Sequence, residues 1–224
     1  MRNRAGLLPF AAGGLAFVCF LAVMGFMAAA VQPLWGRTLV LLLPALVFCG
    51  VGAAARNGRL SPRAAAALTA VLAAVFLFLS VCYVFLLSIR TATTVTTEVK
   101  YYERAYAQID GNEAVSAHFP ASVPADAREI TFSYTPRFLQ GGEVFLLSYR
   151  TTEEEILRRS ALLRAAAEWS GPDEEWFRMH GQPGGEGDTV RFQLLGSGFG
   201  NHGEACCVLI RRADARITFY YSNW

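Results

Sequence analysis

The first 97 residues contain no acidic residue, although the whole chain of 224 residues contains 18. The same stretch holds three apolar runs without any charged residue, at positions 7–31, 38–55 and 64–89. A helix that crosses the roughly 30 Å hydrocarbon core of a bilayer needs about 20 apolar residues. Each run is apolar on all sides, as lipid-exposed helices are. The sequence therefore predicts a segment of three transmembrane helices over residues 1–90.

The arginines predict the orientation of this segment, because cytoplasmic loops retain Lys and Arg. Five arginines precede the first run or lie between the second and third runs. Only two lie on the other side: Arg37 between the first and second runs, and Arg90 after the third. We therefore expect a cytoplasmic N-terminus and an extracytoplasmic domain after Arg90. Residues 1–30 also resemble a secretory signal, with a basic start and three alanines at 28–30. Cleavage of such a signal leaves the later part of the chain external.

The charge of residues 98–224 differs in sign, with 13 basic and 18 acidic residues. This balance and the absence of a basic stripe in the sequence argue against a nucleic-acid partner. This part has only Cys206 and Cys207, and the chain has no Asn-X-Ser/Thr acceptor, which favours a bacterial envelope over a eukaryotic cell surface. The expected partners are the lipid bilayer and an envelope protein or wall component.

Residue periodicity predicts the fold of this second part. We expect a stalk at 91–97 and a first helix at 98–109. A second helix should begin at the capping box Thr152 to Glu155 and end at Gly171-Pro172. The second helix should face inward with Ile156, Ser160, Leu163 and Ala167, and outward with Arg158, Arg159 and Arg164. Strands are expected at 129–135, 143–150, 189–195, 205–211 and 216–222. These elements predict a two-layer antiparallel α+β domain over 98–224.

The glycine-rich loop 196–204 and its neighbours hold the densest group of candidate catalytic residues. His202, Glu204 and Cys206 or Cys207 are the types found in a cysteine nucleophile with its base. The structural alternative is that both cysteines pack in a strand, because they lie in the apolar run 205–210, with Cys207 on the face of Leu209. The loop lacks the Lys-Ser/Thr ending of a phosphate loop, and His118 and His180 lie in separate connectors. We expect no cofactor and no metal.

Other residue groups admit a functional and a structural interpretation. The acids at 153–155 and 173–175 are candidate glycosidase carboxylates, but three acids at a helix start are explained by capping. Trp169 and Trp176 suit either an aromatic platform or the edge of a small core. The apolar runs have no ionisable residue at their centres, which indicates an anchor and not a transporter.

The motif His118-Phe119-Pro120, Val123-Pro124 and the run from Phe138 to Gly142 resemble uncharacterised membrane-anchored proteins of Gram-positive bacteria. The resemblance implies an envelope location and a shared domain, and it identifies no functional residue. Our leading hypothesis is a membrane-anchored extracytoplasmic binding domain. The alternatives are an envelope hydrolase that uses His202, Glu204 and Cys206 or Cys207, and an accessory subunit for transport or export.

Overall fold

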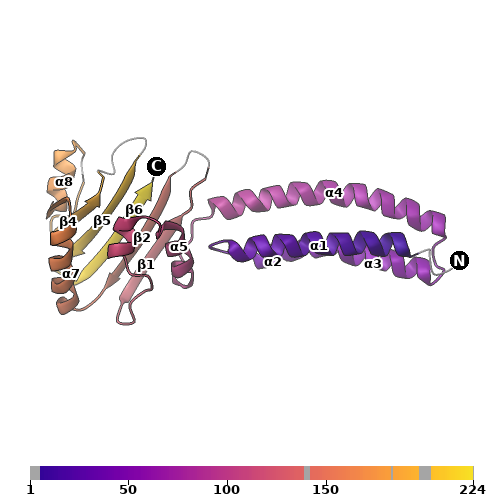
Figure 1. Ribbon diagram of the computed structural model, residues 1–224, viewed down its shortest axis with the longest axis horizontal. Coiled ribbons are helices and arrows are strands. Elements are labelled where there is room, and N and C mark those ends of the chain that lie inside the picture. The colour runs from indigo at the N-terminus through magenta and orange to yellow at the C-terminus, as the bar shows by residue number, and fades with distance from the viewer. Residues whose placement is uncertain (1–5, 139–141, 183, 197–202, 224) are drawn as a thin grey trace. The chain divides into compact units, whose positions relative to one another are not determined.

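The computed structural model describes residues 6–138, 142–182, 184–196 and 203–223. The chain separates into two compact units, Met1–Thr91 and Ala92–Trp224, which are described in turn (Figure 1).

The described part of the first unit consists of helices and short connections. Helix α1 spans Leu7–Ala29 and helix α4 spans Pro62–Thr93; between them α2 (Trp35–Thr38), the 3-10 turn η2 (Leu39–Leu42) and α3 (Leu43–Arg56) form one continuous stretch. Pro44 stands in the first turn of α3, where its missing N–H matters least, and the tighter η2 turn precedes it. The unit thus has three helices that are long and apolar enough to cross a membrane, as predicted.

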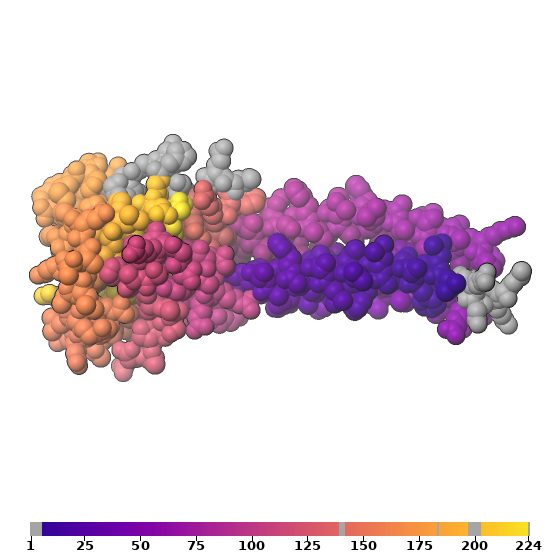
Figure 2. All heavy atoms as spheres, viewed as in Figure 1, coloured from indigo at the N-terminus to yellow at the C-terminus, as the bar shows by residue number. Residues whose placement is uncertain are grey.

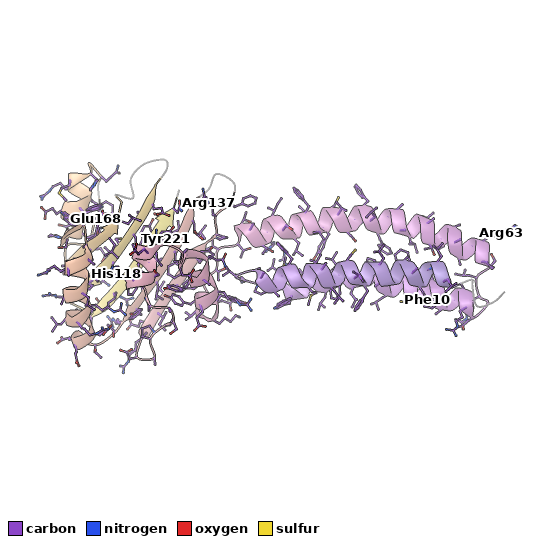
Figure 3. All side chains as sticks on the ribbon, in the orientation of Figure 1. Phe10, Arg63, His118, Arg137, Glu168 and Tyr221 are labelled. Atoms are coloured by element: carbon purple, nitrogen blue, oxygen red, sulfur yellow. The ribbon has the colours of Figure 1, made fainter. Side chains whose placement is uncertain are left out.

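Helices α1 and α3 pack closely because small residues line their contact. A Cβ atom on Gly13 would lie 3.3 Å from the carbonyl oxygen of Ala45 and from Phe48 Cβ. Nearer the start of α1, the Phe10 ring (Figure 3) lies against Gly52, where an added Cβ would be 3.0 Å from the ring. Small residues at such contacts let the helix backbones approach and gain van der Waals contacts. In lipid these contacts replace the hydrophobic effect as the force that holds helices together.

The second unit is built on one six-stranded antiparallel sheet with strand order β1-β2-β6-β5-β4-β3. The strands are β1 (Arg128–Thr135), β2 (Glu143–Arg150), β3 (Trp169–Pro172), β4 (Thr189–Leu195), β5 (Glu204–Arg211) and β6 (Arg216–Asn223). The helices are η3 (Val99–Tyr101), α5 (Tyr102–Ile109), α6 (Glu113–His118), α7 (Glu153–Ala166) and α8 (Asp173–Met179). The antiparallel α+β prediction is thus consistent with the structure.

An aromatic core fills the space between α5, α6 and α7 and one face of the sheet. The ring centroid of Tyr102 on α5 lies 5.5 Å from those of both Phe132 and Phe145. The centroid of Phe119, after α6, lies 5.1 Å from that of Phe219. Helix α7 buries Ile156, Ser160 and Leu163 as predicted, and its Thr152 hydroxyl accepts a hydrogen bond from Glu155 N. Alternate strand residues point into this core, as the period of two requires.

Two residues on the predicted faces of the second helix are placed differently in the structure, and the first helix begins later than predicted. Arg159 does not lie on the outer face of α7: its guanidinium donates to the carbonyl of His118 and lies over the Phe219 ring. Ala167 is the C-cap of α7 and not an inward position. In the first predicted helix, at 98–109, residues 99–101 form a 3-10 turn and the α-helix begins at Tyr102.

The sequence interpretation missed three short elements. Asn112 caps α6 by accepting hydrogen bonds from the amides of Ala114 and Val115. The second helix ends at Ala166 and not at Gly171-Pro172, because residues 169–172 form strand β3 against β4. Helix α8 follows at once and lies on the other face of the sheet, so that the domain has more than the two expected layers.

The segment expected as a stalk has specific structure. Helix α4 continues to Thr93, and Thr96 is 1 % exposed. Thr96 exchanges two backbone hydrogen bonds of 2.8 Å with Tyr134, which adds one antiparallel bridge to the edge strand β1. The end of the segment is thereby attached to the sheet.

Candidate functional site

The sheet has a second face, which we call the open face. Helix α8 lies over its β3 and β4 portion, where the Arg191 guanidinium sits 5.5 Å from the Trp176 ring and 5.2 Å from the Phe177 ring. Beside α8 lies a hollow of about 350 Å³, within the usual range for small-ligand sites. It is lined by Thr131, Leu146, Ser148, Asp173, Glu186, Thr189, Leu209, Arg211, Arg216 and Thr218.

A row of four arginines crosses one end of the open face. Arg128, Arg150, Arg216 and Arg211 stand in register on β1, β2, β6 and β5. Like charges directly opposite each other on neighbouring strands repel. The row therefore requires negative charge nearby, and the structure supplies it from outside the regular strand positions.

Three acidic residues pair with three of these four arginines. Glu129 pairs with Arg150 at 2.7 Å and with Arg216 at 2.9 Å, Asp214 in the β5–β6 turn pairs with Arg211 at 2.9 Å, and Glu186 pairs with Arg211 at 2.6 Å. Hydrogen bonds from the Arg211 guanidinium, together with those from Arg216, hold the pKa of Asp214 well below its usual range. The guanidiniums of Arg211 and Arg216 are thus held in place by carboxylates.

A buried ion pair continues the network beneath α8. Arg191 Nε donates to Asp173 Oδ1 at 2.6 Å, and the two side chains are 12 % and 6 % exposed. The other Asp173 oxygen accepts from the backbone amide of Glu186. Gly185 brings this loop so close to α8 that an added Cβ would lie 2.5 Å from Glu174 Cα. The contact fixes Glu186 at the wall of the hollow.

The floor of the hollow is polar but uncharged. Thr131, Ser148 and Thr218 stand in register on β1, β2 and β6, and Leu209 on β5 continues the row. The Ser148 and Thr218 hydroxyls are 2.8 Å apart, and Arg216 Nη1 donates to Ser148 at 3.4 Å. Thr131 is exposed. The hollow therefore offers hydroxyls from three strands beside two leucines, Leu146 and Leu209.

The structure assigns structural contacts to Glu204. Its carboxylate accepts from Tyr221 Oη at 3.2 Å, from Asn223 Nδ2 at 3.1 Å and from Asn112 Nδ2 at 2.9 Å. Tyr221 is labelled in Figure 3. Glu204 thus joins the start of β5 to the cap of α6. Its predicted partner His202 lies outside the described residues.

The two cysteines point to opposite faces of β5, and neither is activated. Cys206 is fully buried toward the helices, and Cys207, 1 % exposed, faces α8. Burial raises the pKa of Cys206, and it raises the pKa of Cys207 to about 11 even though Arg191 lies beside the Cys207 sulfur. A nucleophilic thiolate needs a lowered pKa. These two thiols therefore give the hydrolase alternative no support.

The remaining candidate residues are dispersed. The Trp169 and Trp176 rings are 5.1 Å apart, and the His180 ring lies 4.2 Å from Trp176, so the aromatic cluster closes the edge of the sheet under α8. His118 is at the end of α6, where burial and then the nearby Arg159 lower its pKa. Among the described residues, no group of three or more His, Cys, Asp and Glu side chains is placed to hold a metal ion.

The arginine row and the hydroxyl row were not found from the sequence. Each consists of single residues on strands that are distant along the chain, and register alone brings them together.

No family model matches the chain, and comparison with curated proteins and with solved structures finds no match.

Proposed function

We propose that this chain is a membrane-anchored binding protein of a bacterial envelope, and that its domain at residues 98–224 lies outside the cell and binds an uncharged polar ligand in the hollow of the open face. The three apolar helices support the anchor. The arginine distribution and the acidic, cysteine-poor second part support the orientation and the compartment.

The lining of the hollow carries the proposal. Its charged residues are two acids, Asp173 and Glu186, and two arginines, Arg211 and Arg216, and all four are held in ion pairs. A charged ligand would meet no net attraction and would have to compete with these short ion pairs. An uncharged polar ligand matches both the balanced charge and the hydroxyl floor, so charge complementarity selects it.

A second surface competes with the open face. Helix α7 exposes Leu157 and Leu162 by 60 % and 55 %, beside a hollow lined by Leu157, Ser160, Ala161, Arg164, Ala165 and Arg212. The α7 residues appear in orange in Figure 2. Its lining is mostly apolar and basic and lacks the row of hydroxyls, so the open face fits a specific polar ligand better.

Photo-crosslinking in cells of the organism that carries this chain tests the proposal. A benzophenone amino acid inserts into C–H bonds of any ligand near it, and it replaces Leu209 in the hollow, Leu157 on α7 or the exposed Gln108 on α5 as control. We expect an adduct of higher mass from position 209 and none from 108. An adduct from position 157 alone, or equal adducts from 209 and 108, would refute the open face as the binding surface.

A further inference from the structure

The hydroxyl row limits which uncharged ligand the hollow can recognise. The Arg211 guanidinium donates from all three nitrogens, to Asp214 and Glu186, and Arg216 donates to Asp214, Glu129 and Ser148. These cations are therefore committed to partners within the protein. Ser148 is also committed, because it is 7 % exposed, accepts from Arg216 and shares a hydrogen bond with Thr218. The hydrogen-bonding capacity left for a ligand belongs mainly to the hydroxyls of Thr131 and Thr218.

A hydroxyl both donates and accepts, and so its best match is another hydroxyl. The three hydroxyls come from adjacent strands, and strands in a sheet lie about 4.8 Å apart. Ser148 stands between the other two and holds the Thr218 hydroxyl 2.8 Å from its own. Thr131 and Thr218 therefore present two hydroxyls from strands two places apart in the sheet, and each can donate or accept. Among uncharged ligands, those with several hydroxyls on one rigid ring can meet such a row at more than one point.

Apolar groups flank the hydroxyls in the same hollow. Leu209 continues the hydroxyl row, and Leu146 stands two residues along β2 from Ser148, opposite Tyr220 on β6, which lies beside the lining of the hollow. Both leucines and Tyr220 are half-buried, so each offers part of its surface. A sugar ring has an apolar C–H face and a polar rim of hydroxyls, and this combination of Leu, Tyr and Ser/Thr side chains accommodates both.

We infer that the hollow is a saccharide site: Thr131 and Thr218 bind ring hydroxyls, Ser148 positions the Thr218 hydroxyl, and Leu146 and Leu209, with Tyr220 beside the lining, pack against the C–H face. The inference rests on the proposed function, since it names the ligand class of the same site. The balanced charges select neutral sugars over anionic polymers. An extended peptide fits less well, because its side chains alternate and its backbone groups would face a sheet whose own backbone is already paired.

Binding of neutral tetrasaccharides to the full chain tests the inference. The protein is placed in phospholipid nanodiscs, which avoid the sugar headgroups of many detergents, and titrated with maltotetraose, cellotetraose and the N-acetylglucosamine tetramer. A heparin-derived tetrasaccharide is the anionic comparison. We expect at least one neutral sugar to bind with a dissociation constant below about 1 mM, a weak small-ligand affinity, and more tightly than the anionic one.

Matched threonine variants locate the sugar. Thr131→Val removes an exposed hydroxyl in the hollow, and Thr218→Val removes a second. Thr135→Val makes the same change four residues along β1, outside the lining. We expect each of the first two variants to weaken binding at least fivefold and Thr135→Val to leave it unchanged. The melting temperature of each variant shows whether the fold is intact.

The outcomes separate the saccharide from the proposed function. If none of the three neutral sugars binds, if the anionic sugar binds more tightly, or if Thr131→Val and Thr135→Val behave alike, the saccharide assignment is wrong. A protein adduct from position 209 in cells, without sugar binding, would keep the open face as a binding surface and make its ligand a protein. If no adduct forms from position 209, the proposed function itself is refuted.

Discussion

Glu129 adopts a backbone conformation that residues with side chains rarely use, with φ of 48°. It lies where the pairing of β1 with β2 shifts between Arg128 and Thr131. Such a conformation costs on the order of 1 to 3 kcal/mol, and an exposed ion pair contributes at most about 1 kcal/mol. The two pairs that Glu129 makes with Arg150 and Arg216 can together contribute up to about 2 kcal/mol, which is comparable with this cost.

The two adjacent cysteines provide a prediction at the scale of single residues. The structure places Arg191 Nη1 3.3 Å from the Cys207 sulfur, so a serine hydroxyl there has a donor. Cys206 is fully buried, and a hydroxyl left unpaired there costs about 1 to 3 kcal/mol. We expect Cys206→Ser to be clearly more destabilising than Cys207→Ser.

Thermal unfolding of the full chain in nanodiscs, followed by tryptophan fluorescence, measures both variants. Cys206→Ala and Cys207→Ala are the controls, because they remove the sulfur without adding a hydroxyl. An equal loss of stability in the two serine variants would contradict the opposite environments assigned to these side chains.

At the scale of elements, the first unit depends on how closely its helices approach. Gly13 and Gly14 are neighbours on α1, yet only Gly13 faces α3: a Cβ on Gly13 would contact Ala45, Phe48 and Cys49, and a Cβ on Gly14 would meet nothing within 4 Å. The adjacent glycines therefore form a matched pair for testing this helix contact.

We expect Gly13→Leu to separate α1 from α3 and to destabilise the first unit by about 1 to 3 kcal/mol, the usual cost of overpacking. Gly14→Leu places the same side chain on the other side of the helix and should have little effect. The fraction of folded protein after heating in nanodiscs, read by gel filtration, compares the variants. Equal losses would show that α1 and α3 do not pack through Gly13.

At the scale of the whole molecule, the chain divides by charge as it divides by structure. The first 97 residues carry seven arginines and no acid, whereas residues 98–224 have a net charge of −5. The structural division falls after Thr91. Helix α4, with 32 residues, exceeds the roughly 20 that a bilayer requires, so both its ends can reach the interfaces even when it is tilted.

This asymmetry predicts the topology, and reporter fusions measure it. Alkaline phosphatase is active only outside the cytoplasm, and we expect it to be active when fused after Arg90 and inactive when inserted at 56–63. A cytoplasmic reporter such as green fluorescent protein at the same two positions is the control and should show the opposite pattern. Activity in the 56–63 loop with none after Arg90 would reverse the orientation.

Much of the fold follows from local patterns in the sequence. The apolar runs, the alternation in five of the strands and the Thr152 cap each lie within a few consecutive residues, and all were predicted. The short elements α6, β3 and α8 were missed because none exceeds seven residues, which is too short for a clear period. Strand β3 exists because β4 offers it a partner, and Gly171-Pro172 had indicated only a helix end.

The sequence by itself determined the three apolar helices, the change of charge near residue 97 and the antiparallel α+β class, because each depends on local composition or periodicity. Only the tertiary structure decided that Thr131, Ser148 and Thr218 share a row, that three of four aligned arginines meet three acids, and that Asp173 and Arg191 form a buried pair. These groupings join residues far apart in the chain, such as Glu129 and Arg216, which are 87 positions apart. Strand order and register bring them together, and neither is written in any local pattern.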